Sequence, residues 1–305
     1  MRIHSSGLVP WWLKIILKII LSRLPIKYSR WSRLSIFRHG SMDDPEYAYR
    51  VAEKHYNRAS KLLGDKFVCM EIGPGDSLLS SLCMSAFGAS KIYMVDVEDF
   101  AVKDVKLYYE MFKFIDSSSE FELSDDFRFN ILGDQSDKEN VNSPNAIISN
   151  LNAHYLTDGI RSLKSIADNS IDFIWSHAVL EHISYSEFDK YFIELYRILK
   201  FGGISSHRVD LKDHLSGGLK NLFFSDVVWE SNFMSSSGFY TNRIRYSDMI
   251  RRFSNVGFDV EVTNIDNWDV LPDRKSFMVK KFSNLPDSEL RTFLTYSKSP
   301  PPFGF

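Results

Sequence analysis

The sequence predicts a doubly wound α/β fold, in which helices cover both faces of a mostly parallel, seven-stranded sheet. Short apolar runs alternate with amphipathic runs of helical length, as in parallel βαβ units with right-handed crossovers. A Gly-x-Gly turn follows the first apolar run, and an aspartate closes the second. With 305 residues, 44% of them hydrophobic and 25% charged, the chain can bury one large core.

The elements of the first half follow from local signals. Asp44-Pro45-Glu46 combines an N-cap, a proline at the first helical position and an acid in the first turn, and predicts a helix that ends near Leu63. The polar segment 116–146 predicts a loop. The third strand is either 147–151 or 153–156. The remaining elements expected here are strands at 67–72 and 92–95 and helices at 78–87 and 100–115.

In the second half, Ser184 and Glu187 form a possible capping box for a helix that runs to Lys200. We name residues 211–246 the lid, because this glycine-, serine- and aromatic-rich segment could cover a site at the sheet edge. The other expected elements are strands at 171–176, 204–209, 258–264 and 277–281 and a helix at 247–256. The domain is predicted to span 43–290, followed by a C-terminal tail at 291–305.

Residues 1–42 form a separate basic arm. Its first 40 residues contain eight Lys or Arg and no acid, whereas the whole chain has a net charge of −2. Residues 10–24 read as an amphipathic helix with two tryptophans, shorter than the about 20 apolar residues of a membrane span. The segment 10–38 therefore suits an anionic membrane surface. Packing on the protein's own body, a dimer contact and an organelle transit segment are the alternatives.

Net charge and cysteine content restrict the cell compartment and the kinds of partner that we expect. Nothing in the overall charge favours nucleic acid. Cys69 and Cys83 both lie in apolar runs, so a disulfide framework is not expected. We expect a cytoplasmic protein, with the arm as a candidate peripheral anchor at the inner membrane face; the oligomeric state is left open.

The glycine turn predicts a nucleoside cofactor. Gly73 and Gly75 follow a strand and open a helix, and lack of a Cβ lets backbone approach a ligand closely. Asp96 closes the next strand 21 residues after Gly75, where a carboxylate can accept both ribose hydroxyls. A dinucleotide fits less well, because Leu78 replaces the third glycine and Asp76 would repel a pyrophosphate. A cationic sulfonium tolerates those acids.

These residues resemble class I S-adenosylmethionine-dependent methyltransferases over roughly residues 50–285. The matching parts are Glu71-Ile-Gly-Pro-Gly-Asp76, Asp96, Asp168–Ile174, Leu180-Glu181-His182 and Leu199–Gly203. The resemblance implies that the glycine turn holds the methionine part, Asp96 the ribose and Asp158 the adenine amine. The implied cofactor-binding residues are Glu71, Gly73, Gly75, Asp76, Asp96, Val97, Asp158, Ser176 and His177. Ser77 departs from the pattern, since many members have a third glycine there.

A weaker resemblance concerns the acceptor, the molecule that takes the methyl group. Ser176–His182 and His207–His214 are similar to methyltransferases of surface-polysaccharide biosynthesis, which implies O-methylation of a sugar or glycan intermediate. Arginines and aromatics of the lid and of the segment just before it, among them Arg208, Arg243 and Arg245, could hold an acidic or phosphorylated sugar, or could form a core of their own. A small-molecule (phenol, quinone or carboxylate) methyltransferase and a non-catalytic binding module are the alternatives, and a nicotinamide dehydrogenase comes third.

Three residues are candidates for the chemistry. A hydroxyl acceptor benefits from a general base, for which we name His207 and His177, with Asp210 as partner of His207. Alternation places 207 and 210 on opposite faces of a strand, so a bend would be needed to join them. Structural histidines are the alternative. His177, Glu181 and His182 have a spacing that could hold a divalent metal, but Leu-Glu-His also occurs in relatives without metal, so no residue is assigned to one.

Overall fold

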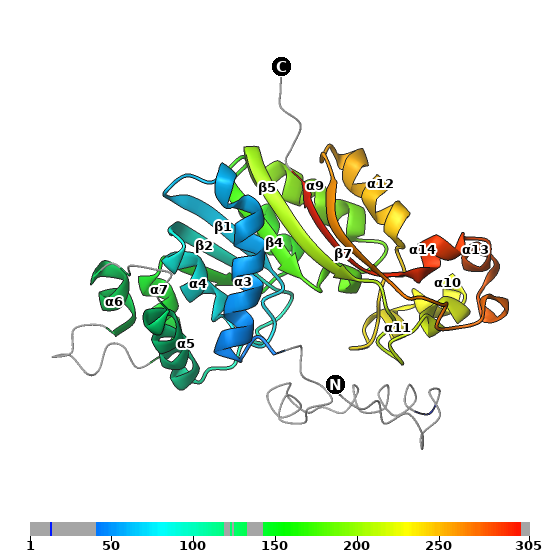
Figure 1. Cartoon of the computed structure of the whole chain (residues 1–305), viewed down its shortest axis with the longest axis horizontal. Helices are drawn as coiled ribbons and strands as arrows, with labels where there is room; N and C mark the ends of the chain where they lie inside the picture. The colour runs from blue at the N-terminus through cyan, green and yellow to red at the C-terminus, as the bar shows by residue number, and fades with distance from the viewer. Residues whose placement is uncertain (1–12, 14–40, 119–122, 124, 133–142, 300–305) are drawn as a thin grey trace.

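The computed structural model describes residues 13, 41–118, 123, 125–132 and 143–299, and it contains one seven-stranded sheet (Figure 1). The strand order is β3-β2-β1-β4-β5-β7-β6. The first five strands are parallel, and β7 pairs antiparallel with β5 and β6. The predicted fold class is thereby confirmed. The predicted basic arm lies almost wholly outside the described residues, as does the end of the tail after 299.

The strands agree with the sequence prediction up to β5 and depart from it afterwards. The third strand is the second of the two alternatives. The strand predicted at 277–281 is wrong, because these residues lie in short helical turns, and the last strand comes instead from the predicted tail. The strands are β1 Phe67–Ile72, β2 Ala89–Val95, β3 Ala153–Leu156, β4 Ile171–His177, β5 Leu199–Asp210, β6 Glu261–Asn267 and β7 Thr292–Ser299.

Helices cover both faces of the sheet and bury one core on each. Along β1, Cys69 faces one core and Met70 the other, as alternation along a strand requires. The first core contains residues of α3 Pro45–Ala59, α4 Ser80–Ala86 and α5 Val105–Ser117. The second contains residues of α8 Ile160–Lys164, α9 Phe188–Ile198 and α12 Tyr246–Val256. Between them the two cores hold the parallel strands in place.

Two local predictions are corrected by the helices. The predicted loop at 116–146 contains α6 Asp125–Leu132 and the start of α7 Pro144–Asn150, whose Ile131 and Ile147 reach the first core. The capping box before α9 does not form. The N-cap is Glu187 without a side-chain hydrogen bond, and the Ser184 carbonyl accepts the Phe188 N–H at 3.0 Å instead.

The α3 start behaves as predicted. The Asp44 side chain accepts the Tyr47 N–H at 2.8 Å, and Pro45 occupies the first turn. The 3-10 turn η1 Ser60–Leu62 then ends the helical run. This capping fixes α3 along the first core, so that its inward side chains reach β4 and β5.

The lid is a small packed unit. In Figure 1, α10 Asp226–Trp229, α11 Asn232–Ser235, α13 Lys280–Ser283 and α14 Asp287–Arg291 gather at one end of the sheet. The 3-10 turn η3 Lys220–Phe223 packs against the segment that follows η4 Lys275–Phe277, where the Val279 N–H donates to the Leu222 carbonyl at 3.1 Å. The lid has its own apolar cluster around Trp229 and Phe239. Among the described residues, none of the helices combines the length and the apolar character needed to cross a bilayer.

Candidate active site

The glycine turn after β1 has a backbone that only glycine adopts readily. Gly73 and Gly75 have φ of 66° and 67°, in the left-handed region. The Gly73 N–H donates to the Val95 carbonyl at 2.8 Å. A Cβ on Gly73 would lie 2.5 Å from a methyl carbon of Val179. The turn is therefore packed directly against the segment that follows β4.

Asp96 joins the glycine turn to the end of β2. Its carboxylate accepts the Gly75 N–H at 3.1 Å and the Val97 N–H at 2.7 Å. Burial raises the pKa of Asp96 to about 6, although these two hydrogen bonds act in the opposite direction. The predicted turn and acid are thus in direct contact, whereas the binding of a ribose by Asp96 stays a prediction.

Two further acids surround the turn. Glu71, in β1, is buried and accepts a hydrogen bond from the Ser80 hydroxyl. Burial raises the pKa of Glu71 to about 8, so the carboxyl is mostly neutral at pH 7. Asp76 is also buried, and its carbonyl accepts the Val102 N–H at 2.8 Å. The segment 71–76 therefore contains two acidic residues and no lysine or arginine.

Asp158 and Ser176, both predicted to bind the cofactor, differ in their exposure to solvent. Asp158 follows β3 and is exposed, with an ion pair to Arg161 at 3.2 Å. The next residue, Gly159, donates its N–H to the Asp96 carbonyl at 2.8 Å, which keeps Asp158 at the same sheet edge. Ser176 is fully buried in β4, and its hydroxyl lies 2.7 Å from His207 Nδ1. Its side chain therefore turns toward the second core.

A cavity of about 440 Å³ lies beside the ends of β2 and β3. Leu78 and Tyr108 line it from one side, and Leu156 and Thr157 line it just before Asp158. The space is therefore next to the residues predicted to hold the nucleoside.

His177 closes β4 and faces α3. Its Nδ1 lies 3.2 Å from Nε2 of His55, and His55 Nδ1 lies 2.9 Å from the Ser206 hydroxyl. Burial, with neighbouring cations, lowers the pKa of His177 to about 3. Sequence reasoning missed His55, although a histidine in the small-residue stripe Ala48, Ala52 and Ala59 was a visible signal.

His207 lies inside the second core. It is fully buried, its ring lies near Phe192 and Phe253 with centroids 6.2 and 5.6 Å away, and its two nitrogens contact the hydroxyls of Ser176 and Ser205. Because β5 continues through Asp210 without the required bend, His207 and Asp210 do not meet. The geometry thus does not support His207 as the base, since no acceptor could reach its nitrogens.

Asp210 instead serves the loop after β5. Its carboxylate pairs with Lys212 at 3.3 Å, and its backbone N–H donates to the Glu181 carboxylate at 3.3 Å. Asp210 therefore connects the end of β5 with the turn after β4.

Three cations gather on the α3 face of the sheet. Lys54, Arg58 and Arg208 lie 4.0, 4.5 and 5.9 Å from the centre of the Tyr296 ring. Arg208 is the register partner of both His177 and Tyr296. Within the described part of the chain, none of the three forms a salt bridge with a carboxylate. We call Lys54, Arg58 and Arg208 the cation cluster.

The lid arginines are structural. Arg243 pairs with Glu230 at 2.8 Å and Asp226 at 2.6 Å and is almost fully buried. Arg245 donates to the carbonyls of Leu211 and Thr292 at 2.7 and 2.6 Å. The alternative that these residues form the core of the lid is therefore favoured over a role in holding the acceptor.

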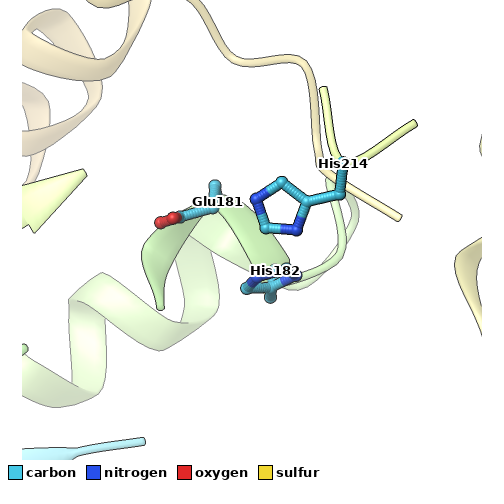
Figure 2. Close-up of side chains that lie close together, drawn as sticks. All are labelled: Glu181, His182 and His214. Atoms are coloured by element: carbon cyan, nitrogen blue, oxygen red, sulfur yellow. The ribbon is translucent and has the colours of Figure 1, made fainter. Parts of the chain in front are cut away.

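A group of possible metal ligands lies at the same edge (Figure 2). One ligand atom each from Glu181, His182 and His214 lies within 4.8 Å of the others. His177, which the sequence analysis grouped with Glu181 and His182, turns to His55 instead. His214, from the lid, takes its place.

Comparison with known proteins agrees with this geometry. Residues 70–206 match the family model described as a methyltransferase domain, a segment that runs from β1 into β5 and includes the glycine turn, Asp96 and Glu181. With the sheet order, the match defines a methyltransferase fold. Residues 70–206 form a methyltransferase domain, the sheet has the order found in class I S-adenosylmethionine-dependent methyltransferases, and S-adenosylmethionine is the cofactor.

Solved structures with a similar chain course include phosphoethanolamine N-methyltransferase 2 of Haemonchus contortus in complex with S-adenosylmethionine. It is 15% identical over 97% of this chain and 61% of that chain, with a TM-score of 0.48. In a second structure of that enzyme, the alignment covers 83% of this chain and 52% of that chain at 15% identity, with a TM-score of 0.46, so this chain spans about half of its length. A methyltransferase of Archaeoglobus fulgidus is 11% identical over 82% and 93% of the two chains, with a TM-score of 0.43. A search of the curated proteins finds no match.

Proposed function

We propose that this protein transfers a methyl group from S-adenosylmethionine to a hydroxyl of a sugar or glycan intermediate of cell-surface polysaccharide. The observation that carries the methyl transfer is the contact of the Gly75 N–H with the Asp96 carboxylate, inside the segment that matches a methyltransferase domain. When bound, the cofactor supplies a methyl group on a cationic sulfur. Gly73 and Gly75 offer backbone without a Cβ, and Asp96 offers acceptors for ribose hydroxyls.

His177 is the general base of this proposal. A histidine whose Nδ1 is turned to His55 keeps Nε2 for the acceptor. If Nδ1–H of His177 donates to His55, and His55 Nδ1–H donates to Ser206, then Nε2 of His177 carries a lone pair. The acceptor oxygen would gain the methyl group as the bond from the methyl carbon to the cofactor sulfur breaks, which leaves S-adenosylhomocysteine, and Nε2 of His177 would take the acceptor's proton. His55 acts as a positioning residue.

The cation cluster supports an acidic or phosphorylated acceptor. Three positive charges that have no carboxylate partner among the described residues favour an anion, and arginine forks match phosphate and carboxylate groups. The same cations contribute to the low pKa of His177, after burial. An anionic acceptor would offset them and raise the pKa of His177, so that the base becomes stronger when its substrate is present.

The most direct test incubates the full chain with methyl-labelled S-adenosylmethionine and a cell-envelope extract. We expect label in an acidic glycan or sugar fraction, and much less label with Asp96→Ala when S-adenosylmethionine is limiting. Label only in phenols, quinones or small carboxylates would replace the glycan proposal by the small-molecule alternative. A chain that binds no S-adenosylhomocysteine in calorimetry would contradict methyl transfer altogether and favour a binding module.

Replacing His177 distinguishes a role in catalysis from a role in cofactor binding. His177→Ala should lower turnover by about 10²–10⁴-fold, the usual contribution of a general base, while the affinity for S-adenosylhomocysteine stays within about twofold. His55→Ala should lower turnover less than His177→Ala does. Normal turnover of His177→Ala would remove it from the proposal.

We further propose a location at the inner face of the membrane, where lipid-linked glycan precursors would meet the enzyme. The support is the sequence of the basic segment 10–38, which lies outside the described residues apart from position 13.

A further inference from the structure

We propose that Glu181, His182 and His214 bind one divalent transition-metal ion of the zinc and cobalt class. Their ligand atoms lie within 4.8 Å of one another at the carboxyl edge of the sheet (Figure 2). Two imidazole nitrogens and one carboxylate oxygen are ligands that such ions accept, and three protein ligands leave coordination positions open.

Two strand ends bring these ligands together. The 3-10 turn η2 Leu180–His182 follows β4 and carries Glu181 and His182 as neighbours in sequence. His214 follows β5, in the lid. The rings of His182 and His214 stand 4.7 Å apart, inclined by 64°. Since β4 and β5 are parallel neighbours, their ends place the three side chains at one point.

Glu181 has a buried oxygen without a partner. The residue is only 2% exposed, and one carboxylate oxygen accepts the Asp210 N–H at 3.3 Å. Among the described residues, the other oxygen, Oε2, has no hydrogen-bond donor. A buried carboxylate oxygen left in this state is costly, and a bound cation would satisfy it. The unpaired oxygen therefore supports a bound cation independently of the spacing of the three ligand atoms.

His182 is held in the form that binds metal. Its Nδ1 lies 3.0 Å from the Tyr240 carbonyl oxygen, which can only accept. Nδ1 therefore carries the proton, and Nε2 carries the lone pair. Metal-binding histidines commonly donate their other N–H to a carbonyl in this way, which fixes the ring and its tautomer.

Binding requires a small closure. With metal–ligand distances of roughly 2.1 Å, two ligand atoms can be at most about 4.2 Å apart. The ligand atoms lie within 4.8 Å of one another, which is slightly wider than this limit. Side-chain rotations that bring these atoms closer by a fraction of an ångström would complete the site. His214 is the member on the lid, and its movement would draw the start of the lid toward η2.

The position of the site suggests its use. Val179, two residues before Glu181, contacts the position of a Cβ on Gly73, so the ion would lie close to the glycine turn. An ion with open positions can take an acceptor hydroxyl and lower its pKa. This use rests on the proposed function, whereas the binding of the ion does not.

The experiment measures metal binding by the full chain after removal of metal with a chelator. Titration with Co²⁺, followed by visible absorption and by calorimetry, should show one ion bound per chain with the spectrum of nitrogen and oxygen ligands. His214→Ala should weaken binding at least tenfold, and Glu181→Gln likewise. The matched control is His154→Ala, because His154 lies exposed on β3 away from the cluster and should bind Co²⁺ as the unaltered chain does.

Equal Co²⁺ affinity of the unaltered chain and His214→Ala, or no binding at millimolar Co²⁺, would overturn the proposal. Circular dichroism melting checks that each variant is folded, and His214→Ala is the safer variant because Glu181 is buried. Calorimetry with S-adenosylhomocysteine on the same samples keeps the two proposals apart. Cofactor binding without cobalt binding would refute only the metal site, and cobalt binding without cofactor binding would refute only the methyl transfer.

Discussion

At the scale of single residues, the sheet edge separates two kinds of histidine. His177 is half-buried at the end of β4 beside His55, and His207 lies on the neighbouring strand β5, fully buried in the second core. The sequence made His207 the first candidate and His177 the second, because His207 lies at the end of a predicted strand near Asp210 and His177 follows a predicted strand. What distinguishes them is the face of the strand and the length of β5, and neither can be read from residue types alone.

Asp96 gives the sharpest residue-level prediction. Asp96→Ala should weaken S-adenosylhomocysteine binding by about 1.5–3 kcal/mol, because a charge-assisted pair of hydrogen bonds to ribose hydroxyls is lost. Calorimetry measures the affinity. Asp158→Ala is a useful comparison, since its exposed carboxylate is expected to contribute less. Unchanged affinity of Asp96→Ala would refute the ribose assignment.

The same carboxylate predicts a dependence on pH. The pKa of Asp96 is about 6, above its usual value, so the ionised form is lost as pH falls through 6. Cofactor affinity should therefore decrease below about pH 6. The contribution of Asp96 to folding has the opposite sign, because a raised pKa means that the folded state holds the proton more tightly and gains stability as pH falls. Calorimetry and urea unfolding from pH 5 to about 8 measure both trends, and Asp96→Asn should flatten each.

His207 predicts a loss of stability. His207→Ala removes a fully buried ring and leaves two serine hydroxyls without their partner, which should cost about 2–4 kcal/mol in the free energy of unfolding. Urea denaturation measures it. The exposed His154→Ala should change stability by less than about 0.5 kcal/mol. A folded, fully stable His207→Ala protein with low turnover would return His207 to the role of base.

At the scale of elements, the sequence did not determine the role of the arginines in the lid. Arginines beside aromatics predict either ligand binding or a core, and only burial decides between them. The cation cluster was missed for a related reason. Its members come from α3 and β5, far apart in sequence, and only the contact with Tyr296 of β7 brings them together.

The lid also carries a prediction. Arg243→Ala should lower the free energy of unfolding by roughly 2–4 kcal/mol, because Glu230 would lose its cationic partner and keep only the Tyr240 hydroxyl. The pair with the half-exposed Asp226 contributes less, because solvent screens it. Limited proteolysis should then cut first within 211–246. Arg251→Ala is the control, since this arginine forms an exposed pair with Asp248 and should leave the pattern unchanged. Identical digestion of both variants would contradict the structural role.

At the scale of the molecule, the sequence predicted the fold class, the first five strands and the cofactor edge. These follow from apolar runs, glycines and a strand-end acid, which are local signals. It did not predict β7. On this strand Thr295 and Ser297 are buried along with Leu294 and Tyr296, so polar residues on an inward face concealed the hydrophobic pattern. Long-range pairing with β5 and β6 determines this strand.

The basic arm predicts a whole-molecule behaviour. Deleting residues 1–40 removes eight positive charges and should release the protein from anionic vesicles, with cofactor affinity unchanged. Cosedimentation with phosphatidylserine vesicles at low and high salt measures this. A shortened chain that still sediments with the vesicles would show that another surface binds them.

The place of β7 has a consequence for biosynthesis. In the described sheet, β7 Thr292–Ser299 lies between β5 and β6 and follows both of them in the chain. The sheet can therefore be completed only after this segment has left the ribosome, and until then β5 and β6 present two open strand edges. We expect premature stops before residue 292 to give aggregates or chaperone clients, even though the whole cofactor-binding half has already been made.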